Sequence, residues 1–556
     1  MKYNGAEIVI KLLEDEAVEY ISGIPGGFNL PLYDALYKSK ITHILARHEQ
    51  GAGFIAQGMA RTTGKVGVCF ATSGPGVTNL LTAIADAKLD SIPLVAITGQ
   101  VPLSAIGTDA FQEVDAYGLT IPITKHNFLI RSIDELFKII PEAFKIALEG
   151  RPGPVLIDIP KNIQTQVIDL DEFPVTNNSF IVKKASDIPT LKSIADSINT
   201  STKPILYAGG GIVGSGASED LFKLSKKSNI PVTLSLMGLS AFPSNDELNI
   251  GMLGMHGAVY TNYLMNEADL IIALGIRFDD RATGKIQDFC PNAKIIHIDI
   301  DPSEINKVKS TNISMVANAK DFLKSLLPLI NDVSREDWIA VVKDFRSRYP
   351  LPSYKNPMHP ANIIPFVASK VPEDTIIATD VGEHQMWTAQ RYPFKIPRSF
   401  ITSGGLGTMG FGLPAAIGAA LANPEKLVIS FSGDGSILMN IQELATLNEF
   451  CLNVKVIVLN NHHLGLVRQQ QELFYKKHYI ASCFIGNPDF KTIARGFGMN
   501  SYDLSEESDP FKRLEEILSS PGPCLINIPI DETENVLPMV APGASNMIMI
   551  GGVSND

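Results

Sequence analysis

Short apolar segments rich in β-branched residues alternate with segments of helical periodicity along most of this chain. In the first third, strand-like runs such as VGVCFAT, IPLVAITG and PVLIDIP are separated by helical patterns such as EQGAGFIAQGMART. The alternation resumes in the last third through TIIATD, KLVISF, VKVIVLN and CLINIPI. Because parallel strands need a long crossover, usually a helix, this pattern predicts parallel sheets covered by helices. The expected fold class is α/β.

The length and two irregular connections predict more than one domain. A chain of 556 residues is too long for one hydrophobic core. Residues 165–180 are polar with weak periodicity, and residues 348–362 are rich in proline and asparagine. We therefore expect three doubly wound parallel-sheet domains, over 1–165, 185–330 and 360–556, with a similar plan in the first and third.

Composition excludes several classes of function. The net charge is -12 and no basic stripe is present, so nucleic acid is not an expected partner. The five cysteines form no Cys-x-x-Cys pair, which argues against a disulfide framework or a zinc site and favours a reducing compartment. No apolar run approaches the roughly 20 residues of a membrane span. The apolar positions of the first 20 residues recur at helical spacing with acids between them, whereas a signal peptide would need an unbroken apolar stretch. We expect a cytoplasmic protein with no membrane partner.

A Gly-Asp-Gly turn and an Asn-Asn pair each follow an apolar run in the last third. The segment between Gly435 and Asn460 is long enough for a helix and a return strand, which would place Asp434 and Asn461 at neighbouring strand ends. A carboxylate, an amide oxygen and a nearby carbonyl suit Mg²⁺, which fills its shell with phosphate oxygens and water. The glycines would let the backbone approach a diphosphate. Taken alone, the same three residues are also a common turn.

This spacing resembles the signature of thiamin diphosphate enzymes. In that family the aspartate, the second asparagine and a main-chain oxygen two residues later hold the metal, which here implies Asp434, Asn461 and His463. The segment LARHEQGAGFIAQGMAR also resembles the family and makes Glu49 the carboxylate that hydrogen-bonds the pyrimidine ring of the coenzyme. A lone glutamate at a helix start is more often a solvated partner of the helix dipole. The small residues after Glu49 favour a buried interface instead.

The resemblance extends over nearly the whole chain to the catalytic subunits of the acetohydroxyacid synthase family. It rests on GIPGG, TSGPGVTNL, IGTDAFQEVD, GRPGPVLIDIPK, GMLGMHG, RFDDRATGK, VGEHQMW, SGGLGTMGFGLPAA and PMVAPGASN, in that order. It implies a transferase that joins two pyruvates with loss of CO₂ to give 2-acetolactate, or pyruvate and 2-oxobutyrate to give 2-aceto-2-hydroxybutyrate, at the first shared step of branched-chain amino-acid synthesis. It also implies Mg²⁺, FAD, a homodimer or homotetramer in which Glu49 and the diphosphate site come from different subunits, and a separate small regulatory subunit.

The resemblance assigns further residues. Beside Glu49, the residues implied near the reacting centre are Gly27, Gln112, Lys161, Arg281, Met409 and Gln470. Those implied around thiamin diphosphate are Pro75, Asn79, Gly382, Glu383, His384, Gly407, Met409, Gly433, Asp434, Gly435, Ser436 and Asn461. Those implied around FAD are Arg151, Gly209, Gly210, Gly211, Leu253, Gly254, Met255, His256, Gly275, Arg277, Asp279, Arg281, Asp299, Ile300 and Asn318.

Several of these residues have a simpler interpretation. Met409 would prop the coenzyme into a bent shape, but it could equally be a core methionine. Arg281 would meet the carboxylate of the second oxo-acid as a bidentate fork, although such arginines also hold domains together. Gly209, Gly211 and Gly214 match a G-x-G-x-x-G pattern, which alone would suggest a nicotinamide site; the expected acid about 20 residues further on is poorly placed.

Three positions depart from the commonest family pattern. Gln470 stands where most members have a tryptophan that favours the larger second substrate; a polar amide buries the extra methyl less well, at a cost of about 1 kcal/mol, so we expect weak preference for 2-oxobutyrate. Phe28 stands where small residues are usual and would either narrow the substrate channel or fill space by packing. Glu383 replaces a glutamine near the expected diphosphate, where a second negative charge would weaken coenzyme binding.

Two other functions stay open at this level. One is a pyruvate oxidase-like or other thiamin diphosphate enzyme, in which a flavin accepts electrons; the RFDDR, IGTDAFQEVD and PMVAPGASN segments favour the synthase. A simple decarboxylase would more often have a His-His pair in its first domain. The other is a catalytically silent scaffold, against which the intact Asp434, Asn461 and Glu49 argue.

Overall fold

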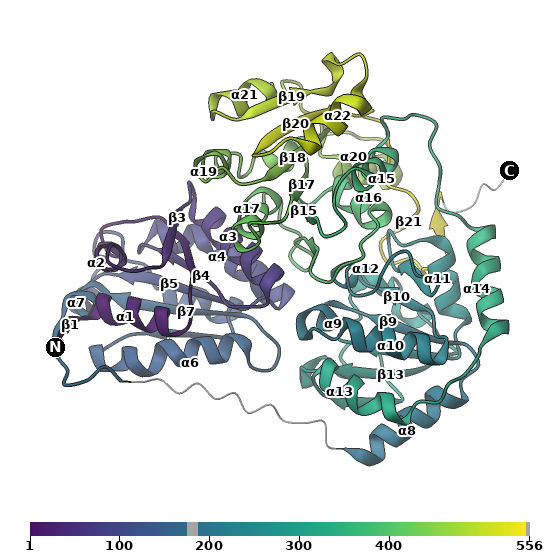
Figure 1. Cartoon of the computed structure of the whole chain (residues 1–556), viewed down its shortest axis with the longest axis horizontal. Helices are drawn as coiled ribbons and strands as arrows, with labels where there is room; N and C mark the ends of the chain where they lie inside the picture. The colour runs from purple at the N-terminus through teal and green to yellow at the C-terminus, as the bar shows by residue number, and fades with distance from the viewer. Residues whose placement is uncertain (175–186, 552–556) are drawn as a thin grey trace.

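The N-terminal domain is built on a parallel sheet with helices on both faces. The structure is a computed structural model and describes residues 1–174 and 187–551. The strand order is β3-β2-β4-β5-β7-β6 (Figure 1), and the strands are β2 (Tyr20–Gly23), β3 (Thr42–Leu45), β4 (Gly67–Ala71), β5 (Leu94–Gln100), β6 (His126–Leu129) and β7 (Pro154–Pro160). One face packs against α1 (Gly5–Asp15), α2 (Leu30–Leu36) and α6 (Leu136–Leu148). The other packs against α3 (Glu49–Thr63) and α4 (Pro75–Asp90).

The C-terminal domain repeats this plan. Its sheet order is β16-β15-β17-β18-β20-β19, from β15 (Ile376–Thr379), β16 (Phe400–Ile401), β17 (Val428–Gly433), β18 (Val454–Asn460), β19 (Asn500–Asp503) and β20 (Cys524–Pro529). Counted along the chain, both sheets have the order 2-1-3-4-6-5. The helices are α15 (Pro360–Ser369), α16 (Glu383–Arg391), α17 (Gly412–Ala422), α18 (Asp434–Ile437), α19 (Glu443–Glu449), α20 (Gly465–Phe474), α21 (Phe490–Gly496) and α22 (Pro510–Ser519). The predicted likeness of the first and third domains is therefore confirmed.

The central domain has a different strand order. Its sheet runs β11-β10-β9-β12-β13-β14, from β9 (Pro204–Ala208), β10 (Val232–Leu234), β11 (Asn249–Met252), β12 (Leu270–Leu274), β13 (Lys294–Asp299) and β14 (Ile313–Val316). This is the 3-2-1-4-5-6 order of dinucleotide-binding folds, in which the chain reverses direction across the sheet between β9 and β12. The helices are α8 (Ile188–Thr200), α9 (Gly210–Ser215), α10 (Ser218–Ser228), α11 (Val259–Glu267), α12 (Asp280–Thr283), α13 (Ala319–Leu326) and α14 (Glu336–Arg348).

The expected three-domain α/β fold is confirmed, with some elements outside the expected ranges. Helix α14 follows residue 330 and packs on the central domain, where the indole N–H of Trp338 donates to the carbonyl of Pro204 at 3.0 Å. Short antiparallel pairs join β1 (Lys2–Asn4) to β8 (Val167–Asp169) and β21 (Met539–Val540) to β22 (Met549–Ile550). Two further short helices are α5 (Ala116–Thr120) and α7 (Lys161–Thr165). Part of the predicted connection over 165–180 lies outside the described residues.

Helices α3 and α17 join the N-terminal and C-terminal domains. Figure 1 shows them side by side between the two sheets, and their apolar residues share one buried core. Glycine is required at two positions of this contact. A Cβ at Gly58 would overlap the carbonyl of Ala415, and one at Gly418 would overlap the carbonyl of Ile55. The two helix backbones therefore touch, which fixes one domain against the other.

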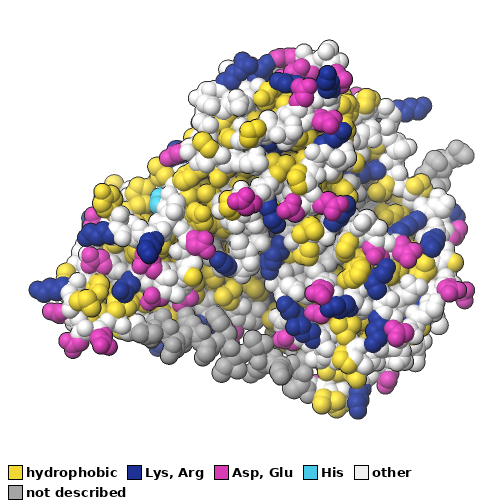
Figure 2. Space-filling view, viewed as in Figure 1, with side chains coloured by type: hydrophobic (Ala, Val, Ile, Leu, Met, Phe, Trp, Pro, Cys, Tyr) yellow, Lys and Arg dark blue, Asp and Glu magenta, His cyan; other side chains and the backbone are white. Residues whose placement is uncertain are grey.

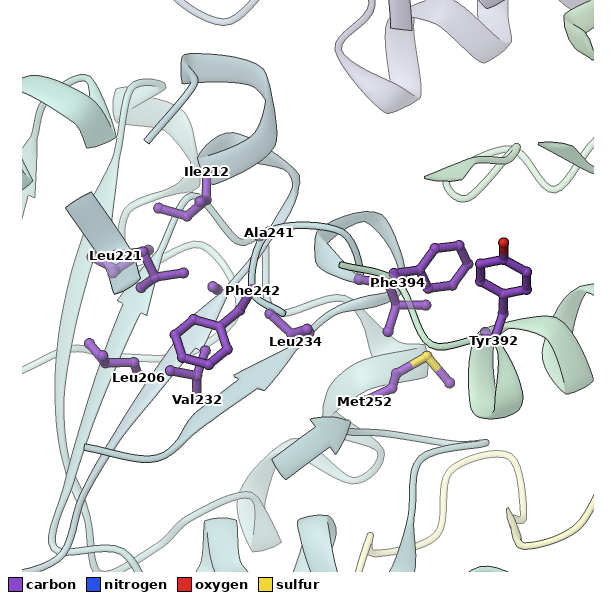
Figure 3. Packing of buried hydrophobic residues seen from close by; sticks show 14 of the residues in the cluster. Leu206, Ile212, Leu221, Val232, Leu234, Ala241, Phe242, Met252, Tyr392 and Phe394 are labelled. Atoms are coloured by element: carbon purple, nitrogen blue, oxygen red, sulfur yellow. The ribbon is translucent and has the colours of Figure 1, made fainter. Parts of the chain in front are cut away.

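The central and C-terminal domains also share a continuous core. Met252 of the central domain lies beside Tyr392 and Phe394 of the C-terminal domain in Figure 3, and Phe242 belongs to the same cluster on the side of Leu206 and Val232. Lysine and arginine side chains are interspersed with acidic ones on the face drawn in Figure 2. Among the described residues, no helix is both long and apolar enough to span a bilayer.

Candidate active site

A cavity of about 190 Å³ lies at the carboxyl ends of the C-terminal sheet. Parallel α/β sheets place ligands at this edge. Its lining comes only from the C-terminal domain and includes most of the residues expected around thiamin diphosphate: Gly382, Glu383, His384, Gly407, Met409, Gly433, Asp434, Gly435, Ser436, Asn461 and His463. The volume is below the roughly 300–1,000 Å³ of a complete small-molecule pocket. The cavity is therefore the size of part of a site.

Asp434 and Asn461 lie at the ends of adjacent strands. Strands β17 and β18 are paired in register up to Gly433, so the next side chains meet at one edge. Asp434 is 1% exposed, and burial raises the pKa of its carboxyl to about 6. The backbone N–H of His463 donates to the amide oxygen of Asn461 at 3.1 Å, so this oxygen faces the turn that holds His463. Within the described residues, no cluster of three His, Cys, Asp or Glu side chains could hold a metal, so a cation here would depend on amide and carbonyl oxygens.

Asn487 is a member of this site that the sequence did not reveal. Its side-chain amide donates to Asp434 at 2.8 Å and to the side-chain oxygen of Asn460 at 2.8 Å. It follows the Asn-Asn pair by 26 residues, in an irregular segment whose position depends on tertiary packing. The only signal in the sequence for Asn487 is that it is an asparagine in a polar loop.

Glu383 is buried beside two of the three predicted metal ligands, Asn461 and Asp434. One carboxylate oxygen accepts from the amide of Asn461 at 3.0 Å and lies directly over the Cα of Gly465, leaving no room for a Cβ there. Burial raises the pKa of Glu383 to about 8, with Asp434 adding to the rise and Arg468 opposing it. A raised pKa favours the neutral acid, which lessens the expected repulsion toward a diphosphate.

The cavity contains buried polar atoms that have no hydrogen-bond partner among the described residues. They are one carboxyl oxygen of Glu383, the Nε2 of His384 and the indole N–H of Trp387. Buried polar groups are nearly always hydrogen-bonded, so unpaired ones that line a cavity indicate a polar ligand. The side-chain oxygens of Asp434 and Asn461 could ligate a divalent cation. Together with the unpaired polar atoms, they fit a diphosphate that is bound through such a cation.

Glu49 occupies the first position of α3, 9% exposed, in the N-terminal domain. The side-chain amide of Asn79 donates to its carboxylate at 2.9 Å, so two predicted coenzyme residues are brought together. Pro75 starts the same helix that bears Asn79. A solvated partner of the helix dipole would be exposed, which Glu49 is not.

Glu443 of α19 holds the turn before Glu49 from the C-terminal domain. Its buried carboxylate accepts from the backbone N–H of Arg47 at 2.9 Å and of His48 at 3.1 Å, and from the hydroxyl of Thr446 at 2.7 Å. A Cβ at Gly51 would lie 2.5 Å from the same carboxylate, so glycine permits this approach. Sequence reasoning missed Glu443.

The other N-terminal residues cluster at the carboxyl edge of their sheet. Gly27 and Phe28 follow β2, and the Nζ of Lys161 lies 5.8 Å from the ring centroid of Phe28 after β7. The backbone of Gln112, with φ of 61°, packs against Gly74 at the start of α4. None of these residues lines the Asp434 cavity. One chain therefore presents two separate half-sites, one on each terminal domain.

Met409 and Gln470 border the C-terminal half-site. Met409 is half-buried and lines the cavity, outside the clusters of fully buried apolar residues. Gln470 is exposed on α20, three residues after Val467, which lines the cavity. Residues three apart share a helix face, so Gln470 lies toward the cavity mouth.

Arg281 lies at a second cavity, between the central domain and the C-terminal tail. That cavity is lined by Met255, Asp280, Arg281, Gly284, Val540, Ala541, Pro542, Gly543 and Asn546. The guanidinium is largely exposed, 3.6 Å from Asp280, and donates to the sulfur of Met255 at 3.4 Å. The structure does not bring Arg281 into the Asp434 cavity, but it leaves the guanidinium accessible to an anion.

The residues expected around FAD follow the strands of the central sheet. Gly209 to Gly211 follow β9 and Gly275 follows β12, which are the two strands where the order reverses. Dinucleotides bind at this point in such sheets. A Cβ at Gly211 would lie 2.7 Å from the Cα of Gly275, so these glycines also permit close packing. The remaining expected residues of this domain lie at or after strand ends: Leu253, Gly254, Met255 and His256 after β11, Arg277, Asp279 and Arg281 after β12, Asp299 as the last residue of β13, Ile300 after it, and Asn318 after β14.

Some of these side chains have structural contacts of their own. Arg151 pairs with Glu304 at 2.8 Å and Asp301 at 3.4 Å, which links the N-terminal and central domains. Asp279 and Asn318 accept backbone hydrogen bonds at the starts of α12 and α13. Burial raises the pKa of Asp299 to about 6. The sheet therefore suits a dinucleotide, while several of its expected ligands are engaged within the protein.

The three sheets and the Asp434 cavity define a thiamin diphosphate enzyme. Models of this class match at residues 3–119 (thiamine pyrophosphate enzyme, N-terminal TPP binding domain), 191–326 (central domain) and 380–528 (C-terminal TPP binding domain). Similar proteins include acetolactate synthase isozyme 1 large subunit of Escherichia coli, 53% identical over 99% of this chain and 98% of that protein. The isozyme 2 large subunit is 44% identical over 99% and 100%, and the maize chloroplastic acetolactate synthase 1 is 44% identical over 98% and 88%. The chain belongs to the acetolactate synthase large-subunit family.

Proposed function

We propose that this chain catalyses the decarboxylation of pyruvate and the joining of the remaining two-carbon unit to a second pyruvate, giving 2-acetolactate, or to 2-oxobutyrate. The observation that supports this most directly is the cavity with Asp434 and Asn461 at adjacent strand ends. It stands in a chain that is 53% identical to an acetolactate synthase large subunit over nearly its full length.

The C-terminal half-site is proposed to hold the diphosphate end of the coenzyme. Asp434, Asn461 and the carbonyl of His463 would ligate Mg²⁺, with the unpaired groups of His384 and Trp387 free to contact phosphate oxygens. Thiamin diphosphate supplies an electron sink for the loss of CO₂ when it is bound. Asn487 orients the Asp434 carboxylate by donating to one of its oxygens.

The N-terminal half-site is proposed to activate the coenzyme. The Glu49 carboxylate would share a proton with a ring nitrogen of the pyrimidine, and Asn79 holds that carboxylate in place. Gly27, Gln112 and Lys161 would border the reacting centre, and Phe28 beside Lys161 would narrow the approach.

Because the two half-sites do not share a cavity within one chain, we propose that each active site forms between two subunits. Glu49 of one subunit would face the Asp434 cavity of the other, in a homodimer or a homotetramer. The small volume of the cavity within a single chain also supports this arrangement.

Specificity and further partners are part of the proposal. Arg281 would bind the carboxylate of the second oxo-acid, since its guanidinium is accessible. Gln470 at the cavity mouth supports a weak preference for 2-oxobutyrate. The order reversal between β9 and β12 supports FAD binding to the central domain in a structural role. The relatives' name "large subunit" supports a separate small regulatory subunit, and five unpaired cysteines support a reducing compartment such as the cytoplasm.

The test is an assay of purified protein with pyruvate, with and without thiamin diphosphate, Mg²⁺ and FAD, followed by identification of the product. Formation of 2-acetolactate that requires thiamin diphosphate and Mg²⁺ is the expected result. Oxygen uptake with pyruvate, without acetolactate, would instead identify a pyruvate oxidase-like enzyme. The absence of any turnover with bound coenzyme would favour a silent scaffold.

A further inference from the structure

A buried charge network joins the N-terminal domain to a loop of the C-terminal domain. The guanidinium of Arg61, on α3, lies 2.9 Å from the carboxylates of both Asp86 and Asp90, on α4. All three side chains are almost fully buried, with exposed fractions of 4% for Arg61 and 0% for each aspartate. Two buried carboxylates share one cation, so the network needs additional donors to satisfy its second negative charge.

The donors come from the loop over residues 402–410. The backbone N–H groups of Gly404 and Gly405 donate to Asp90 at 3.0 and 2.7 Å. The hydroxyl of Ser403 donates to Asp86, and that of Thr408 does so at 3.3 Å. Burial and the nearby Asp90 raise the pKa of Asp86, and Arg61 with the hydroxyls of Ser403 and Thr408 opposes this rise.

Arg61 contacts the first residue of this loop and the residue directly after it. One of its nitrogens donates to the carbonyl of Thr402 at 2.9 Å, and its guanidinium lies 4.8 Å from the ring centroid of Phe411. Between these two contacts, the loop supplies Gly407 and Met409 to the lining of the Asp434 cavity. Within the loop, the hydroxyl of Ser403 accepts the N–H of Thr408 at 2.8 Å and so closes the turn.

The polar contacts of the loop to its own domain lie at its two ends. At the start, the side chain of Gln385 donates to the carbonyl of Ser403 at 3.1 Å and to the hydroxyl of Thr402 at 2.8 Å, and the hydroxyls of Thr379 and Thr402 lie 2.7 Å apart. At the end, the side-chain amide of Asn440 donates to the carbonyl of Gly410 at 2.7 Å. The conformation of the part before Met409 is therefore fixed mainly by acids of another domain.

We propose that Arg61, Asp86 and Asp90 are positioning residues: they fix the 402–410 loop from the N-terminal domain and thereby place Gly407 and Met409 for coenzyme binding. The inference rests on the proposed function for the identity of the coenzyme. The anchoring of the loop by these three residues does not depend on which coenzyme binds. A packing role alone would stabilise the interface without affecting the affinity of the cavity.

Two variants separate positioning from stability. Asp90→Asn keeps the size of the side chain but turns an amide N–H₂ toward at least one of the donors, because three donors face its two oxygens. Ser403→Ala removes two loop contacts without changing any charge, so it leaves the ion network in place. Asp269→Asn is the matched control, because Asp269 also accepts from hydroxyls and a backbone N–H, far from the loop in the central domain.

The experiment measures three quantities on the full chain: hydrogen exchange at Gly404 and Gly405 without coenzyme, the Kd for thiamin diphosphate with saturating Mg²⁺ by calorimetry, and the urea midpoint. For Asp90→Asn and Ser403→Ala we expect exchange at least tenfold faster and a Kd at least tenfold higher, equivalent to about 1.4 kcal/mol. Asp269→Asn should change neither.

A Kd within twofold of wild type in both variants, with or without a lower urea midpoint, would overturn the proposal. So would unchanged exchange at the two glycines. If the unmodified protein does not bind thiamin diphosphate at all, the proposed function fails instead, and the exchange measurement still decides whether the acids anchor the loop.

Discussion

Replacing Glu443 tests whether this first residue of α19 sets the position of Glu49. In the structure one oxygen of this buried carboxylate accepts two consecutive backbone N–H groups, those of Arg47 and His48. Glu49 follows directly and begins α3. Glu443→Ala leaves both donors without an acceptor, whereas Glu443→Gln retains a carbonyl oxygen that can accept from both.

The magnitudes follow from these contacts. An unsatisfied buried donor costs about 1–3 kcal/mol, so Glu443→Ala should destabilise the protein by about 2–6 kcal/mol. Glu443→Gln loses only the charge assistance of the bonds and should cost about 1 kcal/mol. If the turn shifts by about 1 Å in the alanine variant, misplacement of Glu49 should lower kcat about 100-fold. The glutamine variant should stay within about fivefold of wild type, the equivalent of about 1 kcal/mol.

The assay combines urea denaturation with kcat for pyruvate at saturating coenzyme. Glu449→Gln is the control, because Glu449 pairs with the side chain of the same Arg47 at 2.6 Å but at the surface. Such surface pairs contribute about 0–1 kcal/mol, so this change should have little effect on either quantity. Equal losses in Glu443→Gln and Glu443→Ala would refute the reasoning, since they would show that the charge, and not the acceptor geometry, matters.

Three further predictions concern the coenzyme and the substrates. Glu49→Gln should lower kcat at least 100-fold, because a neutral amide cannot take up a proton. The Kd values for Mg²⁺ and thiamin diphosphate, measured by calorimetry, should stay unchanged. Retained turnover would show that another group activates the coenzyme. Asp434→Asn should weaken Mg²⁺-dependent binding of thiamin diphosphate at least tenfold, and chelation of Mg²⁺ should abolish the difference between the two proteins; equal affinity with Mg²⁺ present would exclude Asp434 as a ligand. Gln470→Trp should raise the preference for 2-oxobutyrate over pyruvate about fivefold in a competition assay. This change is equivalent to about 1 kcal/mol of apolar contact. An unchanged product ratio would place residue 470 outside the second-substrate site.

Local pattern was enough to predict the three parallel sheets. Runs such as KLVISF and VKVIVLN are apolar on both faces because helices cover both sides of these strands, and this signal does not depend on tertiary contacts. Helix α14 was not predicted, since its segment between residues 336 and 348 is mostly polar and only Trp338, Ile339 and Val342 are fully buried. The order of the strands in each sheet could not be predicted from the sequence, although the similarity of the first and third domains was.

The site could be predicted only where it depends on strand ends. Asp434 and Asn461 follow adjacent strands directly, so their proximity follows from the connection between them. Asn487 and Glu443 act at the same places but are positioned by an irregular segment and by the contact between two domains. No periodicity in the sequence encodes such contacts. The separation of Glu49 from the Asp434 cavity is also a result of domain packing, and only the family resemblance implied it.

The close contact of α3 and α17 has a consequence for the separation of Glu49 from the Asp434 cavity. Gly58 and Gly418 bring the two helix backbones together, so the N-terminal and C-terminal domains of one chain form a rigid block. Glu49 lies at the start of α3 at one end of this block, while α17 follows directly after the loop that bears Met409. In the proposed dimer, each active site would join two such blocks. A change that shifts α3 against α17 would then move Glu49 relative to one active site and Met409 relative to the other, so that a single packing contact would set the geometry of both sites at once.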